Sequence, residues 1–404
     1  MKIGIISNLY PPFMRGGAEI IASIEAEGLK KAWQHVFVIS SKPAKVQTGP
    51  NAKPITKLII ESEVNEVLVY RFTPVNLYYY MNDFRFPAFI RALWHVIDTF
   101  NIFSYFTVRK ILKKEKPDLI ITHNLMGVGF LIPMLLRRLK IKHIHTIHDF
   151  QLVTPSGLII KDKEGALSHK LARWFGYTSI MRYLIGSPAV VVSPSKFLLD
   201  FYKQSNFFPK SKKIVLPNPT KGMVEIIKQP SPNLEILYLG QIHKAKGILD
   251  LIDNFKKLKQ KQLVLHVVGV GPDLAKAREL AKDDKRIKFY GWMHHSRLLP
   301  LIGRMDVLVV PSLCYENSPT VIYEALNMGL PILAADIGGV AELIKEGING
   351  WIFPAGDFAT LNKKIEGLYQ QREKLKLMAA QCQRSVEPFY IDNYVSQILE
   401  LAND

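Results

Sequence analysis

The sequence predicts an α/β protein that contains two parallel sheets. Short apolar runs rich in β-branched residues alternate with amphipathic segments, which is the pattern of buried parallel strands connected by helices. A proline-marked crossover at 213–218 (KIVLPN) interrupts the series, which then begins again. A chain of 404 residues is long enough for two cores. We therefore expect two Rossmann-like domains facing each other across a cleft, at 1–213 and 214–387, with a last helix near 388–404 packing back on the first.

The first half is expected to contribute six strands, at 2–7, 35–40, 66–72, 117–122, 142–147 and 189–193. After the first strand a loop ends in Gly16 and Gly17, directly before a helix at 18–31. Paired glycines let the backbone approach a ligand closely, and a helix amino terminus attracts anions. The G-x-G-x-x-G pattern of a dinucleotide site does not follow this strand. The loop is therefore either a ligand-binding loop of another kind or only a tight turn.

From 76 to 106 the chain is both aromatic and basic. Aromatic side chains interleaved with Arg85, Arg91 and His95 suit a membrane interface, or a platform on which sugars or bases stack. They can equally fill the core beneath a long insertion. The sequence leaves these interpretations open.

Histidines cluster around the strand at 142–147. His143, His145, His148 and Asp149 have the spacing H-x-H-x-x-H-D, which is similar to that of a metal-binding cluster. His143 and His145 alternate within the strand, however, whereas the metal clusters of hydrolases lie on loops, so we expect no metal here. His148 stands at the carboxyl end of the strand beside an acid, where it can meet a ligand. A buried structural histidine is the alternative.

The second half is expected to contribute five strands, at 235–239, 263–268, 287–289, 306–310 and 332–334. A glycine-bounded loop at 240–247 (GQIHKAKG) follows the first of them and opens a helix. Lys244 and Lys246 in this loop could balance the charge of a diphosphate without a metal ion. Further glycine loops follow later strands, at 269–273 and 338–342. Because the carboxyl ends of parallel strands share one edge of a sheet, we expect these loops together at that edge.

The most informative stretch is 315–329 (YENSPTVIYEALNMG). Ser318 and Pro319 are residue types that favour an N-cap and a first helical position, so we expect a helix to begin there. Its free N–H groups and its dipole would form an anion site suited to phosphate. Glu324, in the second turn, could accept hydrogen bonds from a sugar diol, and Glu316 would face the group beyond the phosphate. Two solvated glutamates beside an ordinary helix start are the alternative.

Charge and composition restrict the possible partners. The formal net charge is +18, of which residues 1–213, with 30 Lys and Arg against 14 Asp and Glu, hold +16. Such a field attracts nucleic acid, anionic lipid or a phosphorylated acceptor, unless it only keeps the surface soluble. Cys314 and Cys382 indicate neither a metal site nor a disulfide framework. Without a signal-peptide pattern or an uncharged apolar run of about 18 residues, we expect a cytoplasmic protein that does not span a membrane.

Together these features resemble the retaining GT-B glycosyltransferases of family four. The matching motifs extend along essentially the whole chain, in the order of the family: GGAEI at 16–20, IHDF at 147–150, LPNP at 216–219, GQIHKAKG at 240–247, VVGVGPD at 267–273, FYGWM at 289–293, E-x7-E at Glu316 and Glu324, and GGVAELIKEGINGWIFPAGD at 338–357. The last two are the most specific.

The resemblance implies that a sugar moves from a nucleotide diphosphate to an acceptor with its anomeric configuration kept. It implies a donor bound mainly by the second domain, where Glu324 holds the ribose hydroxyls, Glu316 meets the donor sugar near the reacting carbon and Lys246 binds the diphosphate. His148 would touch the donor sugar.

The loops complete the expected donor site. Gly16 and Gly17 would close over phosphate or acceptor. Gln241 departs from the family pattern, in which an Arg commonly contacts phosphate together with the lysine. Gln is a neutral donor, so phosphate binding would be weaker, or Lys244 would compensate. Asn317, Ser318 and Pro319, at the start of the expected helix, are further candidates for binding the donor.

The expected chemistry is metal-independent, because helix termini and Lys246 can stabilise the leaving diphosphate and the sequence contains no D-x-D motif. The acceptor oxygen would attack on the face that the phosphate leaves, and the phosphate could take the proton. A covalent route through Glu316 is the second possibility. We expect a glycan or lipid-linked acceptor of cell-surface polysaccharide or glycolipid synthesis, with a peripheral contact between residues 1–213 and an anionic membrane.

Two other functions fit parts of the sequence. A sugar-nucleotide epimerase of similar fold would need no acceptor. A nucleic-acid-binding protein, which belongs to a different class, would use the positive first half and the aromatic residues at 76–106. We expect no nucleic acid as a partner, because the charge does not belong to a recognisable binding module and the ordered motifs would stay unexplained.

Overall fold

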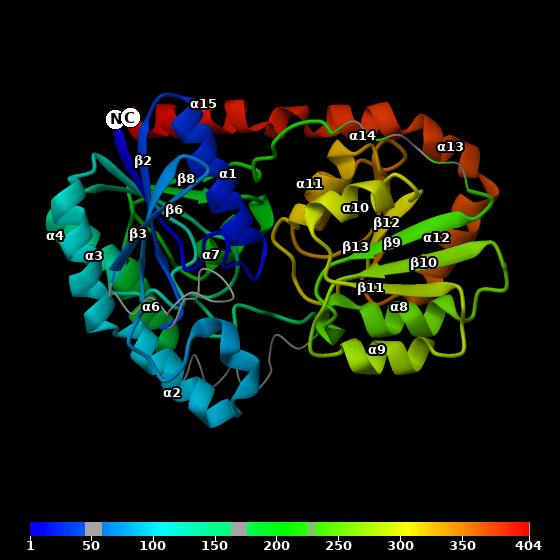
Figure 1. The fold of residues 1–404 in the computed structure, drawn as a ribbon, viewed down its shortest axis with the longest axis horizontal. Helices are drawn as coiled ribbons and strands as arrows, with labels where there is room; N and C mark the ends of the chain where they lie inside the picture. Colours follow the sequence, from blue (N-terminus) through cyan, green and yellow to red (C-terminus); the bar gives the residue numbers. More distant parts are fainter. Residues whose placement is uncertain (45–58, 163–175, 225, 227–228, 230, 404) are drawn as a thin grey trace, which may run out of the picture. The chain divides into compact units, whose positions relative to one another are not determined.

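The computed structural model describes residues 1–44, 59–162, 176–224, 226, 229 and 231–403. The chain forms two compact units (Figure 1). The first consists of Met1–Gly157, Gly165–Pro219 and Ile391–Asp404, and the second of Leu158–Glu164 and Thr220–Tyr390. The first unit extends past the expected limit at 213, because the strand β8 (Lys212–Val215) pairs with β7 (Val190–Ser193) in the first sheet.

The sheet of the first unit has eight strands in the order β3-β4-β2-β1-β5-β6-β7-β8. Its pairs are parallel except at one edge, where β3 and β4 are antiparallel, so the expectation of a purely parallel sheet is wrong there. Asn65 and Glu66 connect these two strands with φ angles of 48° and 64°, the backbone of a tight two-residue hairpin. The remaining strands are β1 (Lys2–Ile6), β2 (His35–Ser41), β3 (Ile59–Val64), β4 (Val67–Phe72), β5 (Leu119–Thr122) and β6 (Lys142–Thr146).

Helices cover this sheet, and the last helix of the chain is one of them. Gly28 of α1 has its Cα against the side chains of Ile391 and Val395 of α15, so the two helices lie side by side (Figure 1). The glycine permits this close approach because it has no Cβ. The helices are α1 (Gly17–Lys31), η1 (Tyr80–Arg85), α2 (Ala88–Thr99), α3 (Ile102–Glu115), α4 (Ile132–Leu139), α6 (Tyr177–Ile185), α7 (Lys196–Gln204) and α15 (Ile391–Asn403).

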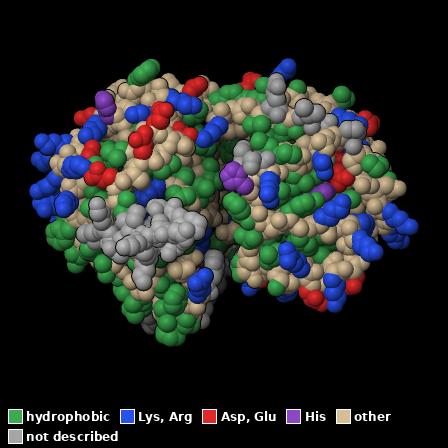
Figure 2. All heavy atoms as spheres, viewed as in Figure 1, with side chains coloured by type: hydrophobic (Ala, Val, Ile, Leu, Met, Phe, Trp, Pro, Cys, Tyr) green, Lys and Arg blue, Asp and Glu red, His purple; other side chains and the backbone are tan. Residues whose placement is uncertain are grey.

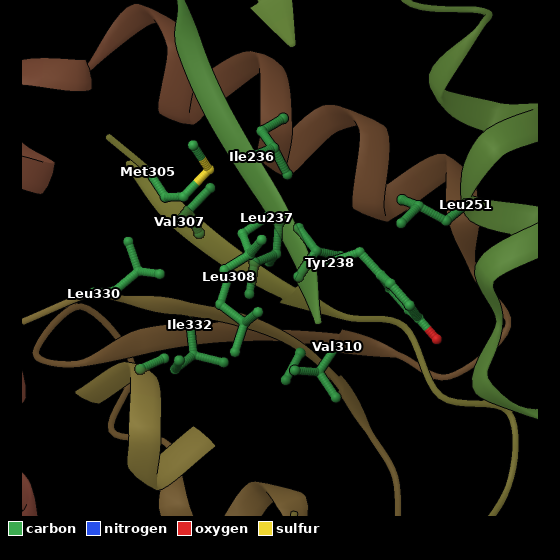
Figure 3. Packing of buried hydrophobic residues seen from close by; sticks show 14 of the residues in the cluster. Ile236, Leu237, Tyr238, Leu251, Met305, Val307, Leu308, Val310, Leu330 and Ile332 are labelled. Carbon is green, nitrogen blue, oxygen red and sulfur yellow. The ribbon is translucent and has the colours of Figure 1, made fainter. Parts of the chain in front are cut away.

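The sheet of the second unit has six strands in the order β11-β10-β9-β12-β13-β14, all parallel. Its core is apolar across neighbouring strands, and Figure 3 shows Leu237, Leu308 and Ile332 lying together. The last strand, β14, was not expected from the sequence. The strands are β9 (Leu234–Leu239), β10 (Leu263–Val268), β11 (Ile287–Gly291), β12 (Val307–Val310), β13 (Ile332–Asp336) and β14 (Gly350–Pro354).

Helices connect these strands, so every strand ends at the same edge, and the connecting loops gather there. The helices are η2 (Lys244–Lys246), α8 (Ile248–Phe255), α9 (Leu274–Ala281), α10 (His295–Ile302), α11 (Thr320–Asn327), η3 (Val340–Leu343), α12 (Phe358–Gln370), α13 (Arg372–Leu377), α14 (Ala379–Val386) and η4 (Glu387–Phe389).

A short segment from the middle of the expected first domain belongs to the second unit. The backbone N–H of Tyr315 donates to the carbonyl of Ile159 (2.9 Å), and the N–H of Lys161 donates to the carbonyl of Leu313 (3.0 Å). An isolated bridge joins Ile160 to Cys314. These bonds attach the segment to the loop after β12, which explains the unexpected boundary at 158.

Candidate functional site

Two loops of the second unit are joined at the carboxyl edge of its sheet. The carbonyl of Ala245 in η2 accepts hydrogen bonds from the N–H groups of Leu313 (2.9 Å) and Cys314 (3.0 Å) in the loop after β12. Gly247 has a φ of +71°, and a Cβ at this position would overlap the carbonyl oxygen of Pro311. The glycine at the end of the GQIHKAKG loop thus allows the backbones to touch, and this contact fixes the position of Lys246.

The contact brings Lys246 to Glu316. The ammonium of Lys246 lies 2.6 Å from Oε1 of Glu316, and the hydroxyl of Ser312 donates to the same oxygen at 2.7 Å. Burial opposes the charge of Lys246, but the neighbouring carboxylate prevails and raises its pKa to about 12. The lysine is therefore a fixed positive charge at the sheet edge. Both charged residues were expected from the sequence, whereas Ser312 was not.

A glycine pair holds the backbone of Glu316. The N–H of Gly339 donates to the carbonyl of Glu316 at 2.8 Å. Gly338 has a φ of +62°, and a Cβ there would overlap that same carbonyl oxygen. The first two residues of the 338–357 motif are thus glycines that contact the backbone of Glu316 and hold it in position.

The helix α11 begins one residue later than expected. Pro319, with a φ of −63° and a ψ of 121°, is the N-cap, and Thr320 is the first helical residue. Ser318 does not cap the helix through its side chain, because its hydroxyl shares a 2.6 Å hydrogen bond with the hydroxyl of Tyr323. Ser318 and Asn317 are both buried. The first N–H groups of α11 have no acceptor within the helix, as at every helix amino terminus.

Glu324 differs from Glu316 in having no polar partner among the residues that the structure describes. Its half-buried carboxylate makes no hydrogen bond or ion pair with the described residues, and burial raises its pKa to about 7. A buried carboxylate without partners is costly, because desolvation disfavours the charged form. Its oxygens are available to accept hydrogen bonds from a ligand, which would compensate that cost.

The glycine loops on either side are also ordered by hydrogen bonds. The N–H of Lys244 donates to Oδ2 of Asp273 (2.7 Å), and the N–H of Asp273 donates to the carbonyl of Ile242 (3.1 Å). Gln241 is exposed, and its carbonyl accepts from the hydroxyl of Tyr238 at 2.7 Å. The side-chain amide of Gln241 forms no hydrogen bond within the described part of the chain. It therefore stays available to a ligand.

In the first unit, His148 belongs to a largely buried chain of polar side chains. Its Nε2 is 2.8 Å from Nδ1 of His123, and Nε2 of His123 is 3.0 Å from Oε2 of Glu25. Burial, together with the neighbouring histidines, lowers the pKa of His148 well below its usual value, so its ring is neutral at neutral pH. The sequence analysis did not select His123 or Glu25. His123 is the first residue after β5 and His148 the second after β6, and this similar placement was the available signal.

The other two histidines of the expected cluster are structural. His143 and His145 are buried on β6, and both contact the hydroxyl of Thr122 on β5, at 2.7 and 2.8 Å. Burial lowers the pKa of His145 to about 3. Among the described residues no group of three His, Cys, Asp or Glu is placed to hold a metal ion.

The paired glycines of the first unit lie at a helix start. α1 begins at Gly17, one residue before the expected start, and Gly16 is its N-cap. The N–H of Gly16 donates to Oε2 of Glu19 at 2.8 Å, so this glycine is held by a side chain of its own helix. Glu19 is buried, and desolvation raises its pKa.

Comparison with known proteins identifies the family. A family model described as Glycosyltransferase Family 4 matches residues 15–221, about half of the chain, and one described as Glycosyl transferases group 1 matches residues 233–371. The chain belongs to glycosyltransferase family 4. Solved structures with the same GT-B fold include sucrose-phosphate synthase from Thermosynechococcus elongatus (TM-score 0.74, 18% identity, 99% of this chain and 98% of that one) and Anabaena Alr3699/HepE in complex with UDP (TM-score 0.68, 18% identity, 100% of both chains).

Relatives of this family 4 glycosyltransferase include a protein of a cps region and a lipopolysaccharide galactosyltransferase. An uncharacterized 42.6 kDa protein in the cps region of Klebsiella pneumoniae is 24% identical over 349 residues, or 85% of this chain and 87% of that protein. The lipopolysaccharide 1,6-galactosyltransferase of Escherichia coli K12 is 30% identical over 200 residues, or 46% of this chain and 53% of that enzyme.

Proposed function

We propose that this glycosyltransferase is a retaining hexosyltransferase that uses a nucleotide-diphosphate sugar. Its acceptor is a glycan or a lipid-linked saccharide in the synthesis of cell-surface polysaccharide or glycolipid on the cytoplasmic side of the membrane. The observation that carries the proposal is the pairing of Lys246 with Glu316 beside α11, whose Glu324 has no partner within the described ranges of the chain. The names of the relatives support the pathway class, since they refer to lipopolysaccharide and to a cps region. A structural neighbour was solved with UDP-glucose, which supports the donor class.

The proposed donor site combines the unpaired carboxylate of Glu324, within the described part of the chain, with Lys246, which the ion pair with Glu316 holds in place. Glu324 accepts hydrogen bonds from the ribose hydroxyls, and Lys246 stabilises the diphosphate. The N–H groups at the start of α11 add partial positive charge where Asn317, Ser318 and Pro319 lead into the helix. The amide of Gln241 supplies a neutral donor to phosphate in place of a charged one.

Stabilisation of the leaving group is the main catalytic requirement in this mechanism. As the bond between the anomeric carbon and the phosphate oxygen breaks, negative charge grows on the diphosphate, and Lys246 lies ready to stabilise it. The acceptor oxygen attacks the anomeric carbon on the same face and gives its proton to the departing phosphate, which keeps the anomeric configuration. A metal ion is not needed in this scheme, and chelation with EDTA should leave the rate unchanged.

Glu316 acts in this scheme by position and charge. Its Oε1 accepts from both Lys246 and Ser312, which disperses the carboxylate charge and disfavours a nucleophilic role. In the first unit, neutral His148 can exchange one hydrogen bond with a hydroxyl of the donor sugar, and the loop at Gly16 and Gly17 closes over phosphate or acceptor.

The experiment is transfer from a panel of nucleotide sugars to polysaccharide-precursor glycolipids, with the new linkage assigned by NMR. We expect no transfer without an acceptor. With an acceptor, transfer should continue when EDTA is added, and the product should retain the anomeric configuration of the donor. An inverted linkage would overturn the retaining mechanism, and loss of activity in EDTA would overturn metal independence. Conversion of the donor without any acceptor would instead indicate the epimerase reaction.

A further inference from the structure

The first unit exposes an apolar helix face that the donor chemistry does not use. In α2 the side chains that point inward include Trp94 and Asp98, both buried. Most exposed side chains of α2 are apolar, namely Ala88, Phe89, Ala92, Leu93 and Val96, and the charged exception is Arg91, whose side chain is 42% exposed. An ordinary surface helix has the opposite arrangement, with its polar side toward water.

This apolar surface continues into the next helix. Exposed apolar side chains recur along α2 at helical spacing and then in the first two turns of α3, with 48% to 73% of each side chain exposed. Figure 2 shows hydrophobic side chains gathered over the lower end of the first unit, where Figure 1 places α2. We call this surface the α2–α3 face and define it by Phe89, Leu93, Val96, Phe100, Ile102 and Phe106.

The inner side of α2 is well anchored, so the face is not a loosely packed core. Tyr78 stacks on both Phe86 and Trp94, with ring centroids 4.2 and 5.6 Å apart, and the indole N–H of Trp94 donates to the carbonyl of Tyr78 at 2.8 Å. Asp98 accepts from the N–H of Gly127 at 2.9 Å. Part of the aromatic stretch therefore fills the core, as one of the open interpretations held, while another part stays exposed.

The charges around this face are mostly positive, although Arg91 lies 3.8 Å from Asp83 and Lys114 lies 2.7 Å from Glu61. Residues 85–114 contain six Lys and Arg and a single acid, the buried Asp98. On α3, Lys110 and Lys113 follow Phe106 on the same side of the helix and are exposed. On α4, Arg138 donates to the hydroxyl of Tyr105, whose ring contacts that of Phe106. Figure 2 shows Lys and Arg gathered beside the face, over α3 and α4.

We propose that the α2–α3 face inserts into the interface of an anionic lipid bilayer, with the surrounding Lys and Arg on the lipid phosphates. Apolar Phe and Leu side chains flanked by basic residues are the features of a helix that lies in a membrane interface. A second copy of the chain is a poorer occupant, because it would bring the same positive charges to the contact. No helix among the described residues is long and apolar enough to cross a membrane, so this contact is peripheral. Its link to a lipid-linked acceptor rests on the proposed function.

The test is co-sedimentation of the full chain with vesicles, without nucleotide or acceptor. We expect binding to phosphatidylglycerol–phosphatidylcholine vesicles, weak binding to phosphatidylcholine alone, and a roughly tenfold or larger loss in Phe89→Ser/Leu93→Ser, from the apolar area removed. The matched control is Trp33→Ser/Leu377→Ser, since both residues are at least as exposed and lie outside the face. It should bind like the wild type. Lys110→Gln/Lys113→Gln should weaken binding to the anionic vesicles only.

Several results would overturn the proposal: no binding by the wild type, an equal loss in the control, or undiminished binding by Phe89→Ser/Leu93→Ser. A dimer in sedimentation velocity that this variant converts to monomer would assign the face to a second copy of the chain. Thermal stabilisation by nucleotide diphosphates should be the same in the variant and the wild type. If nucleotide diphosphates stabilise neither the variant nor the wild type, this result would count against the proposed function but not against the lipid contact.

Discussion

At the scale of single residues, Glu324 makes donor binding depend on pH. Its pKa is raised to about 7, and the proposed contact with the ribose needs the ionised form. Lowering the pH from about 8 to about 6 should therefore weaken nucleotide-sugar affinity roughly tenfold. Calorimetry with a nucleotide-diphosphate sugar measures this, because its esterified phosphates do not titrate in that range. In Glu324→Gln the affinity should be low and nearly independent of pH; a full pH dependence in this variant would assign the effect to another group.

The same raised pKa has a consequence for the ligand-free protein. A carboxyl whose folded pKa lies above its unfolded pKa destabilises the native state at pH values above both, and the cost disappears as the pH falls below the unfolded value. Glu324→Gln should therefore raise the free energy of unfolding by roughly 1–3 kcal/mol at pH 8 and change it little at pH 4. Urea unfolding at the two pH values provides the comparison. A destabilised variant at pH 8 would show that the carboxylate has a stabilising partner.

Lys246 and Glu316 should both be required for transfer, to different degrees. Lys246→Met removes the charge that stabilises the leaving diphosphate and should lower kcat/KM by roughly 100-fold to 1000-fold. Glu316→Gln should also lower it, since the amide cannot hold the ammonium as the carboxylate does. The control is Lys257→Met, which loses only an exposed ion pair with Asp253. Near-normal transfer by Glu316→Gln would exclude an essential charged role for that residue.

Sequence reasoning selected the charged residues of the site better than their partners. Glu316, Glu324 and Lys246 stand in motifs whose spacing is visible in one dimension. Ser312 was missed, and so were His123 and Glu25 behind the expected His148, because such pairs form only when separate elements pack together. That Glu324 has no partner among the described residues is likewise visible only after folding.

At the scale of elements, Gly338 should be intolerant of a side chain. Gly338→Ala would place a Cβ against the carbonyl of Glu316 at a positive φ, so we expect a loss of roughly 2 kcal/mol or more in stability and a large loss of transfer. Gly347→Ala is the matched control, because φ at Gly347 is +73° but the space around its Cβ is empty. It should cost about 1 kcal/mol and leave transfer intact. Equal effects of the two substitutions in thermal unfolding and transfer would contradict the proposed support of Glu316.

The elements that periodicity predicts well are the buried strands. Their apolar runs are unambiguous, and those expected strands agree with the structure to within a few residues. β3 was missed, because its half-exposed edge position does not require an apolar run, and its antiparallel pairing depends on the turn at Asn65 and Glu66. The start of α11 was misplaced by one residue, because Ser318 bonds to Tyr323 in place of the helix backbone.

At the scale of the whole molecule, α15 attaches the end of the chain to the first unit. Gly28→Ala would press a methyl group into Ile391 and Val395, so it should destabilise the protein by roughly 1–2 kcal/mol although Ala favours helices. Gly367→Ala in α12 meets no atom within 4 Å and should stabilise by up to about 1 kcal/mol. Chemical denaturation of the two variants gives the comparison. Stabilisation by both would mean that α1 and α15 are not in close contact.

The limits of the two units were the large-scale feature that was hardest to predict from the sequence. The crossover near 213–218 was visible as a proline-marked break, whereas the transfer of 158–164 to the second unit depends on backbone pairing with the loop after β12. Backbone hydrogen bonds leave no signature in residue type. The ordered motifs, by contrast, indicated the family before any packing was known.

The central claim is that Glu324 of the second unit binds the ribose of a nucleotide donor. The most direct measurement is thermal stabilisation by a panel of nucleoside diphosphates, applied to the wild type, to Glu324→Ala and to Glu373→Ala, which removes an exposed glutamate of α13. A ligand at ~100 times its Kd should add about 2.7 kcal/mol to the wild type. We predict that at least one nucleotide stabilises the wild type and Glu373→Ala alike, and that most of the effect is lost in Glu324→Ala. Equal stabilisation of all three proteins, or of none, would contradict the claim.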